Sequence, residues 1–337
     1  MTTVNVGLIG AGRIGRLHAE HLAQRIPGAR LMAVSDVNLA AAEQCAAALH
    51  VPHAFQDHRP LLENPGIDAV VICSSTPTHA PLIEEAAAAG KHIFCEKPID
   101  FDLARIDRAL GAVEKAGVKL MIGFNRRFDP NFKRVRDLVA AGVLGTPHIV
   151  KITSRDPAPP PIDYVRVSGG LFLDMTIHDF DMARYLSGSE VEEVYAAGGV
   201  LVDPAIGDAG DVDTAIITLR FANGALGVID NSRQAVYGYD QRVEVFGSAG
   251  VASADNNYPN TVLVGDAQRV SRDLPLNFFM ERYIDSYIVE MRAFIACVLE
   301  DRMPPVTGID GRIPVVIGLA AQRSRLENRP VKLNEVV

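Results

Sequence analysis

The first part of the chain alternates between short apolar runs and longer amphipathic segments. The apolar runs predict strands at residues 4–9, 30–35, 67–73, 92–95 and 119–124. Segments with a helical spacing of apolar residues follow several of them, at 16–25, 81–89 and 103–116. Strands that alternate with helices predict a parallel, doubly wound α/β sheet, whose ligands bind at the carboxyl ends of the strands.

In the second part a predicted helix, 128–142, and a strand, 148–153, come first. After about residue 190 the pattern changes to short alternating runs, which predict strands at 215–221, 225–229, 242–246 and 251–254. Asn223-Gly224 between two of these runs predicts a β-hairpin. We therefore expect a large, open, mainly antiparallel sheet flanked by helices. Apolar residues on both of its faces would need two covers, a helix and a second subunit, so a homo-oligomer is expected.

A length of 337 residues allows two domains, each with its own core. We place a dinucleotide-binding domain at 1–122 and a substrate-binding and oligomerisation domain at 123–337. Two further helices are predicted near the C-terminus. We expect the last of them, about 309–327, to pack back on the first domain.

The segment from Gly169 to Leu186 begins with a glycine pair and then continues without Pro or Gly, which predicts one helix. At about 100° per residue, Asp174, His178, Asp181 and Tyr185 fall on one stripe. A carboxylate four residues before an imidazole is suited to orient a general base. The alternative is the solvated face of an amphipathic helix, although such faces usually carry Lys and Glu.

Asp174, His178 and Asp181 are also residues of the types that bind metal ions. We expect no metal, because hydride transfer to a nicotinamide needs none if a lysine supplies the positive charge. Asp179, on the apolar side of the predicted helix, has no explanation from the pattern.

A glycine motif links the first predicted strand to the first helix. Gly10, Gly12 and Gly15 form G-x-G-x-x-G, in which the glycines allow a tight turn, the approach of a pyrophosphate and close packing of helix on strand. Asp36 ends the second strand, 21 residues after Gly15, where it can accept hydrogen bonds from a ribose. A glycine turn in some other α/β protein is the alternative. The Asp36 carboxylate would repel a 2′-phosphate, so NAD is favoured over NADP, although Arg13 partly offsets this preference.

Two polar segments follow later strands, Ser74 to His79 and Glu96-Lys97-Pro98. Lys97 precedes a proline and follows a buried strand, so its backbone should be extended and its ammonium held rigidly beside the nicotinamide, unless it is a surface lysine. The predicted cofactor-binding residues are Gly10, Gly12, Arg13, Ile14, Gly15, Asp36, Ser74, Thr76, Pro77, His79, Glu96 and Lys97.

Charge and composition narrow the class of partner. The net charge of −8 and the absence of a Lys/Arg cluster argue against nucleic acid or an anionic membrane, which leaves a small molecule. The sequence has no basic leader and no apolar run long enough to span a bilayer, so a cytoplasmic protein is expected. Its four cysteines lie far apart and are expected to be reduced thiols rather than zinc ligands or disulfides.

Four motifs occur in an order that resembles the Gfo/Idh/MocA oxidoreductases. They are the G-x-G-x-x-G turn, Glu96-Lys97-Pro98, Gly123-Phe-Asn-Arg-Arg-Phe-Asp-Pro130 and Asp174-x-x-x-His178-x-x-Asp181. The resemblance covers essentially the whole chain. Within the family, Ser154-Arg-Asp-Pro157, Met175 to Arg184 and Tyr237-Gly-Tyr-Asp-Gln-Arg242 look most like the bacterial inositol 2-dehydrogenase branch.

The resemblance implies NAD-linked oxidation of myo-inositol to 2-keto-myo-inositol by a homotetramer. It implies that Lys97, Asp174 and His178 are catalytic, and that Lys97 also contacts the cofactor. The polyol would be bound by the same three residues together with Arg127, Asp156 and Tyr237, of which the last two are the weaker inferences. Two alternatives remain open: the same chemistry on scyllo-inositol or an aldose such as glucose, or a regulator that binds a dinucleotide without catalysis.

Overall fold

The computed structural model describes residues 2–336, which divide into two compact units. The first unit extends to Asn125 and also includes Asp285–Ile313. The second consists of Arg126–Ile284 and the residues from Pro314 onward. The division predicted from sequence places all of 123–337 in one domain. In the structure, residues 285–313 belong to the first unit instead. Buried residues of this segment pack in the core of that unit, as Phe294 does against Phe94.

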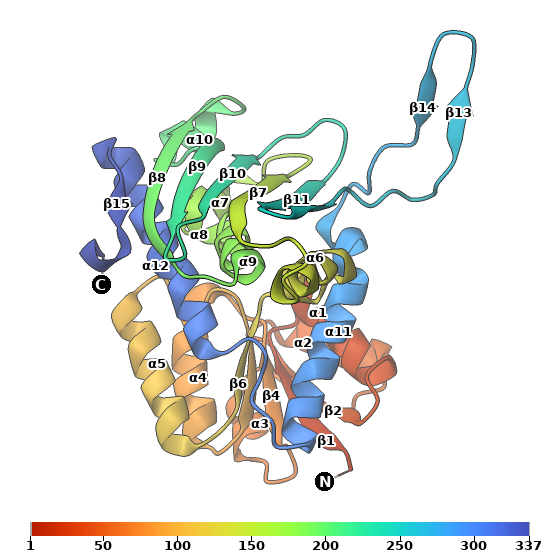
Figure 1. The fold of residues 1–337 in the computed structure, drawn as a ribbon. Helices are drawn as coiled ribbons and strands as arrows, with labels where there is room; N and C mark the ends of the chain where they lie inside the picture. Colours follow the sequence, from red (N-terminus) through yellow and green to blue (C-terminus); the bar gives the residue numbers. More distant parts are fainter. Residues whose placement is uncertain (1, 337) are drawn as a thin grey trace. The chain divides into compact units, whose positions relative to one another are not determined.

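The first unit is built on a six-stranded parallel sheet with the order β3-β2-β1-β4-β5-β6 (Figure 1). Its strands are β1 Val4–Ile9, β2 Ala29–Ser35, β3 His53–Phe55, β4 Ala69–Ile72, β5 His92–Glu96 and β6 Leu120–Gly123. Its helices include α1 Arg13–Gln24, α2 Leu39–Ala48, α3 Arg59–Glu63, α4 His79–Ala88 and α5 Leu103–Ala116. Every side chain of β4 is buried, as a strand covered on both faces requires. This order is that of a doubly wound dinucleotide-binding sheet, so the predicted fold class is confirmed.

The second unit is built on a seven-stranded sheet with the order β12-β11-β7-β10-β9-β8-β15. The strands are β7 Pro147–Arg155, β8 Val191–Gly199, β9 Thr214–Phe221, β10 Leu226–Ser232, β11 Asp240–Gly247, β12 Gly250–Ala254 and β15 Val331–Lys332. The pairing is antiparallel except between β7 and β10. Gly224, with φ +85°, forms the hairpin turn predicted between β9 and β10. The large, mainly antiparallel sheet is therefore confirmed.

The helix predicted over 169–186 is wrong as a single element. The structure has α8 Gly170–Asp174 and α9 Ile177–Ser187, separated at Met175 and Thr176. The amides of both Met175 and Thr176 bond to the carbonyl of Leu171, so the regular ladder slips by one residue at this point. Asp174 and His178 therefore lie on two consecutive helices. The other helices of this unit's first part are α6 Pro130–Ala140, α7 Ile162–Val165 and α10 Pro204–Asp208.

The seven-stranded sheet has one packed and one exposed face. On the inner face, α9 packs against β7, and the buried Thr176 hydroxyl donates to Asn231 of β10 at 2.6 Å. The outer face carries a row of four exposed apolar side chains on adjacent strands, which the strand register aligns: Val251, Phe246, Ile149 and Leu226. We call these four residues the apolar row.

Two long helices each contain residues of both units. They are α11 Phe279–Leu299, with non-helical angles at Tyr283, and α12 Gly308–Glu327, which contains Pro314. The early α12 residue Gly311 lies against Ile99 and Ile122 of the first unit. After Pro314 the helix belongs to the second unit, where Gly318 lies against Leu173. Only the start of the predicted C-terminal helix is therefore part of the first unit.

A β-hairpin that the sequence pattern did not predict follows β12. It consists of β13 Leu263–Gly265 and β14 Val270–Arg272, which form a two-stranded sheet of their own (Figure 1). The short 3-10 helices are η1 Thr76–Thr78, η2 Asn125–Phe128 and η3 Leu333–Glu335. Within residues 2–336, no helix combines the length and hydropathy that crossing a membrane requires.

Candidate active site

The glycine turn after β1 has the geometry that a bound pyrophosphate needs. Gly10 has φ +98°, and a Cβ at Gly15 would lie 1.8 Å from the Gly10 carbonyl oxygen. Both positions therefore require glycine. At Gly12 a Cβ would meet nothing within 4 Å, so its backbone is open to a ligand at the start of α1. The residues present fit a dinucleotide.

Asp36 lies at this turn, immediately after β2. One of its carboxylate oxygens accepts from the amide of Ala11 at 2.7 Å, and the other accepts from the amide of Asn38 at 2.8 Å. The two hydrogen bonds fix the carboxylate beside the glycine turn. This is the position from which an acidic residue recognises the ribose of NAD.

The segment after β4 is fastened to the turn after β5 by His79. The Ser74 and Thr78 hydroxyls are 2.6 Å apart. His79 Nε2 lies 2.9 Å from the carbonyl oxygen of Ser74, and Nδ1 lies 2.7 Å from that of Pro98. Burial lowers the pKa of His79, although both carbonyl contacts act in the opposite direction. Both of its ring nitrogens are thus engaged within the protein, so His79 braces the two strand ends.

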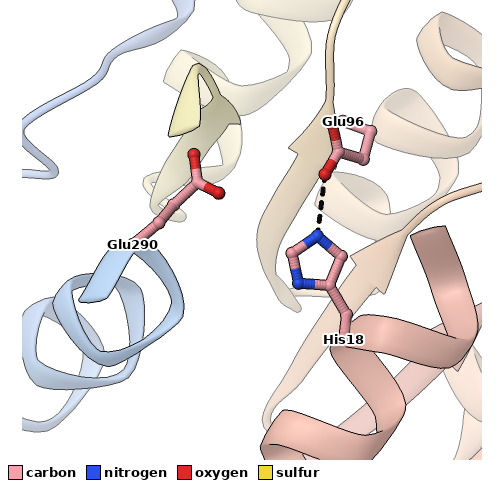
Figure 2. A group of neighbouring side chains, drawn as sticks. All are labelled: His18, Glu96 and Glu290. Carbon is pink, nitrogen blue, oxygen red and sulfur yellow. Dashed lines mark hydrogen bonds and ion pairs between the residues drawn. The ribbon is translucent and has the colours of Figure 1, made fainter. Parts of the chain in front are cut away.

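His18 and Glu96, the residue directly before Lys97, form a largely buried pair, and Glu290 lies close to it (Figure 2). His18 Nε2 on α1 lies 2.7 Å from Glu96 Oε1 at the end of β5. One donor atom of each of the three side chains lies within 4.8 Å of the others. Among residues 2–336 this is the group close enough to share a metal ion, and it does not include Asp174, His178 or Asp181. The pair ties α1 to the strand that ends next to Lys97.

In the second unit, the carboxylate of Asp174 is held by two side chains distant in sequence. It accepts from the Tyr164 hydroxyl at 2.8 Å and from Arg233 Nη2 at 2.9 Å. Arg233 also donates to Asp156, with Nη1 3.3 Å from Oδ2. The Arg233 side chain is only 4% exposed, so one buried guanidinium bridges the two carboxylates. We call Tyr164, Asp174, Arg233 and Asp156 the aspartate cluster.

Burial and the charges within the cluster together set the pKa values of its members. Burial raises the pKa of Asp156 to about 6, and the nearby Asp174 adds to the increase, while Arg233 opposes it. Burial and the adjacent Asp174 also raise the pKa of Tyr164, which therefore remains a hydrogen-bond donor at neutral pH. Burial disfavours the charge on Arg233, but the two carboxylates outweigh it and raise its pKa. The cluster keeps one arginine charged between two carboxyl groups, of which Asp156 binds its proton more tightly than an ordinary aspartate does.

Asp179 is explained by the packed face of the sheet. It is fully buried, pairs with Arg126 Nη1 at 2.5 Å and accepts from Asn231 Nδ2 at 2.9 Å. Asn231 also accepts from Thr176 at the break between α8 and α9. Asp179 thus anchors the start of α9, which carries His178, to β10.

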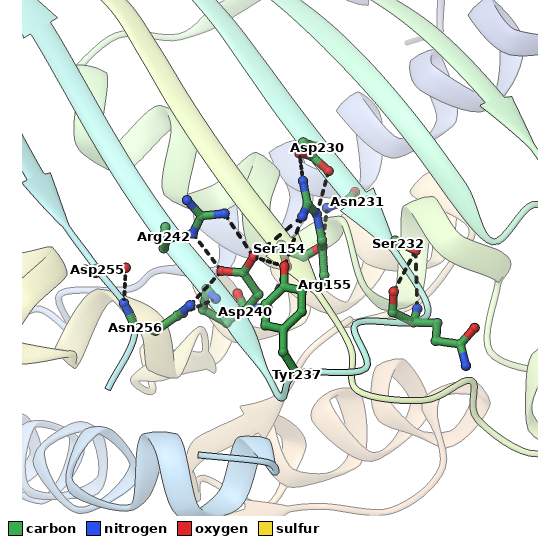
Figure 3. A network of polar contacts seen from close by, with 12 residues as sticks. Ser154, Arg155, Asp230, Asn231, Ser232, Tyr237, Asp240, Arg242, Asp255 and Asn256 are labelled. Atoms are coloured by element: carbon green, nitrogen blue, oxygen red, sulfur yellow. Dashed lines mark hydrogen bonds and ion pairs between the residues drawn. The ribbon is translucent and has the colours of Figure 1, made fainter. Parts of the chain in front are cut away.

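Two predicted substrate residues have partners within the protein. Arg127 binds Asp181 in a bidentate pair, at 2.8 and 2.6 Å, so its guanidinium is fixed on α9. The Tyr237 hydroxyl donates to Asp240 at 2.6 Å and accepts from Arg155 at 3.0 Å, in a network that also contains Asp230 and Arg242 (Figure 3). By strand register, this network lies on the outer face of the sheet. The structure places Asp156, but not Tyr237, in the cluster around Asp174.

Tyr164 and Arg233 are site residues that no pattern in the sequence predicts. They lie 10 and 59 residues from Asp174, distances at which no spacing rule operates. A weak signal for Arg233 was present, because a positive charge directly follows β10, whose side chains are alternately buried and partly exposed.

Comparison with known proteins agrees with both units. Residues 4–124 match the oxidoreductase family with an NAD-binding Rossmann fold, and residues 132–253 match the GFO/IDH/MocA C-terminal domain. The chain is 54% identical to a myo-inositol 2-dehydrogenase of Thermotoga maritima over 99% of this chain and 100% of that protein. It is 47% identical to an inositol 2-dehydrogenase of Rhizobium meliloti, with 98% and 99% covered.

The chain is also similar to a protein whose structure has been solved with bound ligands. The scyllo-inositol dehydrogenase of Lactobacillus casei, with bound NAD(H) and scyllo-inositol, has a TM-score of 0.92 and 31% identity, covering 98% of this chain and 99% of that one. Sequence, fold and glycine turn agree, and the chain is therefore an NAD-binding member of the Gfo/Idh/MocA oxidoreductase family.

Proposed function

We propose that the chain oxidises myo-inositol to 2-keto-myo-inositol with NAD as the acceptor. The observation that carries the proposal is the aspartate cluster, in which Asp174 is fixed by Tyr164 and Arg233. The 54% identity to a protein named myo-inositol 2-dehydrogenase supports the choice of substrate. Among relatives, inositols recur as the substrate named.

Oxidation of a secondary alcohol removes a hydride from carbon and a proton from oxygen. When bound, NAD supplies the hydride acceptor. His178 takes the hydroxyl proton, since an imidazole is suited to general-base catalysis near neutral pH. Asp174 stabilises the resulting imidazolium, and Lys97 donates a hydrogen bond to the oxygen as negative charge develops there. The products are a ketone, the reduced cofactor and one proton, which His178 releases to solvent.

The remaining hydroxyls need both donors and acceptors. We assign Asp156 as an acceptor and Arg127 as a donor. Tyr237 is not assigned a contact, because its hydroxyl is bonded to Asp240 and Arg155 on the outer face of the sheet. Tyr164 and Arg233 are positioning residues, because each acts through Asp174. Their buried hydrogen bonds fix the carboxylate before substrate arrives, which removes the need to reorganise it during the reaction.

A substrate panel tests the proposal against its alternatives. Myo-inositol, scyllo-inositol and glucose are each supplied with NAD and with NADP, and reduction is followed by absorbance. We expect the highest kcat/KM for myo-inositol with NAD. Preference for scyllo-inositol, which is bound in the Lactobacillus casei structure, or for glucose would overturn the substrate assignment. NAD binding without turnover of any polyol would favour the regulator.

Asp36 provides a separate test of cofactor choice. Asp36→Ser removes the charge that repels a 2′-phosphate but retains a small acceptor. We expect the ratio of NAD to NADP activity to fall at least about tenfold, which corresponds to about 1.4 kcal/mol. An unchanged ratio would show that another residue sets the preference.

We also propose that the chain forms a homo-oligomer, with a tetramer as the expected size. The support is the apolar row on the outer face of the seven-stranded sheet, where Val251 is 57% exposed and Leu226 is 49% exposed. A measurement of mass by light scattering at several protein concentrations tests this. A monomer at all concentrations would contradict it.

A further inference from the structure

The hairpin formed by β13 and β14 has no cover within residues 2–336. Every residue from 259 to 274 is exposed. Its strands pair only with each other, at Leu263 with Arg272, Val264 with Ser271 and Gly265 with Val270. In Figure 1 the hairpin projects away from the seven-stranded sheet of its own unit. We call residues 258–275 the arm.

The arm exposes several apolar side chains to solvent. Val262, Leu263, Val264, Val270 and Leu274 are between 59% and 72% exposed. A two-stranded hairpin is marginally stable alone in water, and a cluster of exposed apolar residues is typical of a contact surface. The arm is nevertheless held in shape by contacts at its tip and at its base, so it is a defined element.

Local contacts provide that definition. At the tip, Asp266 accepts from the amides of Gln268 and Arg269 at 2.7 and 3.0 Å. At the base, the Arg272 guanidinium lies 3.6 Å from the centre of the Tyr258 ring. The base is joined to the second unit by the amide of Tyr239, which donates to the carbonyl of Leu276 at 3.0 Å.

We propose that the arm packs against a second copy of this chain. The inference rests on the proposed homo-oligomer and goes beyond it by naming the segment that clasps the neighbouring subunit. Asp266 at the tip is eight positions after Tyr258, which gives a reach of about 26 Å at the rise of a β-strand. This reach is sufficient to extend over a neighbouring domain.

Continuity with the apolar row supports a second copy as the partner. The arm begins four positions after Ala254, the last residue of β12, and β12 is the edge strand that carries Val251. A copy that covers the apolar row from Val251 to Leu226 therefore lies next to the base of the arm. In a contact with two-fold symmetry, the arm of each subunit packs against the other subunit. Both arms are then covered, and no further apolar surface is left exposed.

The charges of the arm point to the same partner. Asp266 and Asp273 balance Arg269 and Arg272, and the outer face of the sheet likewise mixes Lys151 with Glu244, which are paired in register. A balanced surface can meet its own symmetry copy with opposite signs opposed. Nucleic acid or an anionic membrane would require an excess of positive charge, whereas the chain carries −8.

Paired variants test the arm by sedimentation velocity over a range of protein concentrations. In one variant Val264→Asp and Val270→Asp place charge on both strands of the arm. The matched control, Met303→Asp with Leu326→Asp, alters two apolar residues that are 78% and 73% exposed elsewhere. We expect the subunit dissociation constant to rise at least about tenfold in the arm variant and to remain within about twofold in the control. Equal values for the arm variant and the unaltered chain would overturn the inference.

Photo-crosslinking keeps the proposal testable if the charged variant folds poorly. Benzoylphenylalanine replaces Leu263 on the arm, and the product is separated by mass after irradiation. We expect a band at twice the chain mass, with the crosslink mapped to a residue of a second copy. Crosslinks only within one chain would overturn the inference.

The assay of myo-inositol turnover on the same preparations separates the two proposals. Absence of turnover would contradict the proposed reaction but leave the arm contact standing. An oligomer that is insensitive to the arm variant would contradict the arm contact alone. A monomeric unaltered chain would contradict both the homo-oligomer and the arm.

Discussion

The glycine turn of the first unit and the aspartate cluster of the second are built in opposite ways. The turn consists of the backbone of six consecutive residues, Gly10 to Gly15. It can bind a pyrophosphate because its three glycines have no side chain to block the approach. The cluster is made of side chains from four separate segments, brought together by the sheet and by the break between α8 and α9. A contiguous backbone site leaves a pattern in the sequence, whereas a site assembled from distant side chains leaves almost none.

The largest expected effect comes from replacing His178, the proposed general base. In His178→Ala we expect kcat to fall by about 10³-fold, within the usual range for loss of a general base. The dissociation constant for NAD should change by less than about twofold, because the glycine turn is in the other unit. Steady-state kinetics with myo-inositol and a fluorescence titration with NAD measure the two quantities. Near-normal turnover would remove His178 from the proposed mechanism.

The glycine turn can be tested with two substitutions of the same size. Gly15→Ala places a Cβ against the Gly10 carbonyl, so we expect a loss of about 3 kcal/mol in the free energy of unfolding without NAD. Gly12→Ala meets open space and has φ −70°, so its stability should change by less than about 0.5 kcal/mol. Its affinity for NAD should still fall about tenfold, because the new methyl group occupies the approach of the pyrophosphate.

Denaturant unfolding and NAD titration of both glycine variants give the comparison. If the two lost equal stability, the close contact at Gly15 would not explain the motif. If Gly12→Ala bound NAD normally, the open backbone at Gly12 would not be the pyrophosphate site.

These two sites also show how far the sequence could be interpreted. The doubly wound sheet and the hairpin at Gly224 followed from local rules, because apolar period and turn residues act over a few positions. The single helix over 169–186 was wrong because no local rule predicts that the ladder slips at Leu171 or that Thr176 bonds Asn231, more than 50 residues away. Asp179 looked misplaced for the same reason, since its buried partner Arg126 lies on another segment.

Arg233 tests whether the cluster acts as a unit. Arg233→Met keeps the length of the side chain but leaves Asp174 and Asp156 without their shared cation. We expect kcat to fall about 30-fold, or about 2 kcal/mol, with the KM for NAD unchanged. The apparent pKa of Asp156 should rise further, because Arg233 is the charge that lowers it. A pH profile of kcat/KM detects that shift, which a merely structural role would not produce.

Conservative and remote variants complete the test of Arg233. Arg233→Lys should recover part of kcat, since it restores the charge but cannot bind two carboxylates in the same way. Arg312→Met removes an arginine paired with Asp107 in the first unit and should leave kcat within about twofold. If Arg233→Met behaved like Arg312→Met, Asp174 would not depend on its guanidinium.

The smallest expected effect concerns the second acid of the cluster and is a change in stability with pH. The folded-state pKa of Asp156 is about 6, above its ordinary value of 3.8, so the folded protein binds this proton more tightly than the unfolded chain. The contribution of Asp156 to stability is therefore fully present below about pH 4 and is lost as the pH rises to about 6. Asp156→Asn cannot ionise, so its stability relative to the unaltered chain should increase by about 1 to 2 kcal/mol across that interval and stay level above it. Chemical unfolding of both proteins from pH 4 to pH 8 measures the difference. A constant difference would mean that Arg233 neutralises both carboxylates equally, and the cluster would then contain no acid that titrates near pH 6.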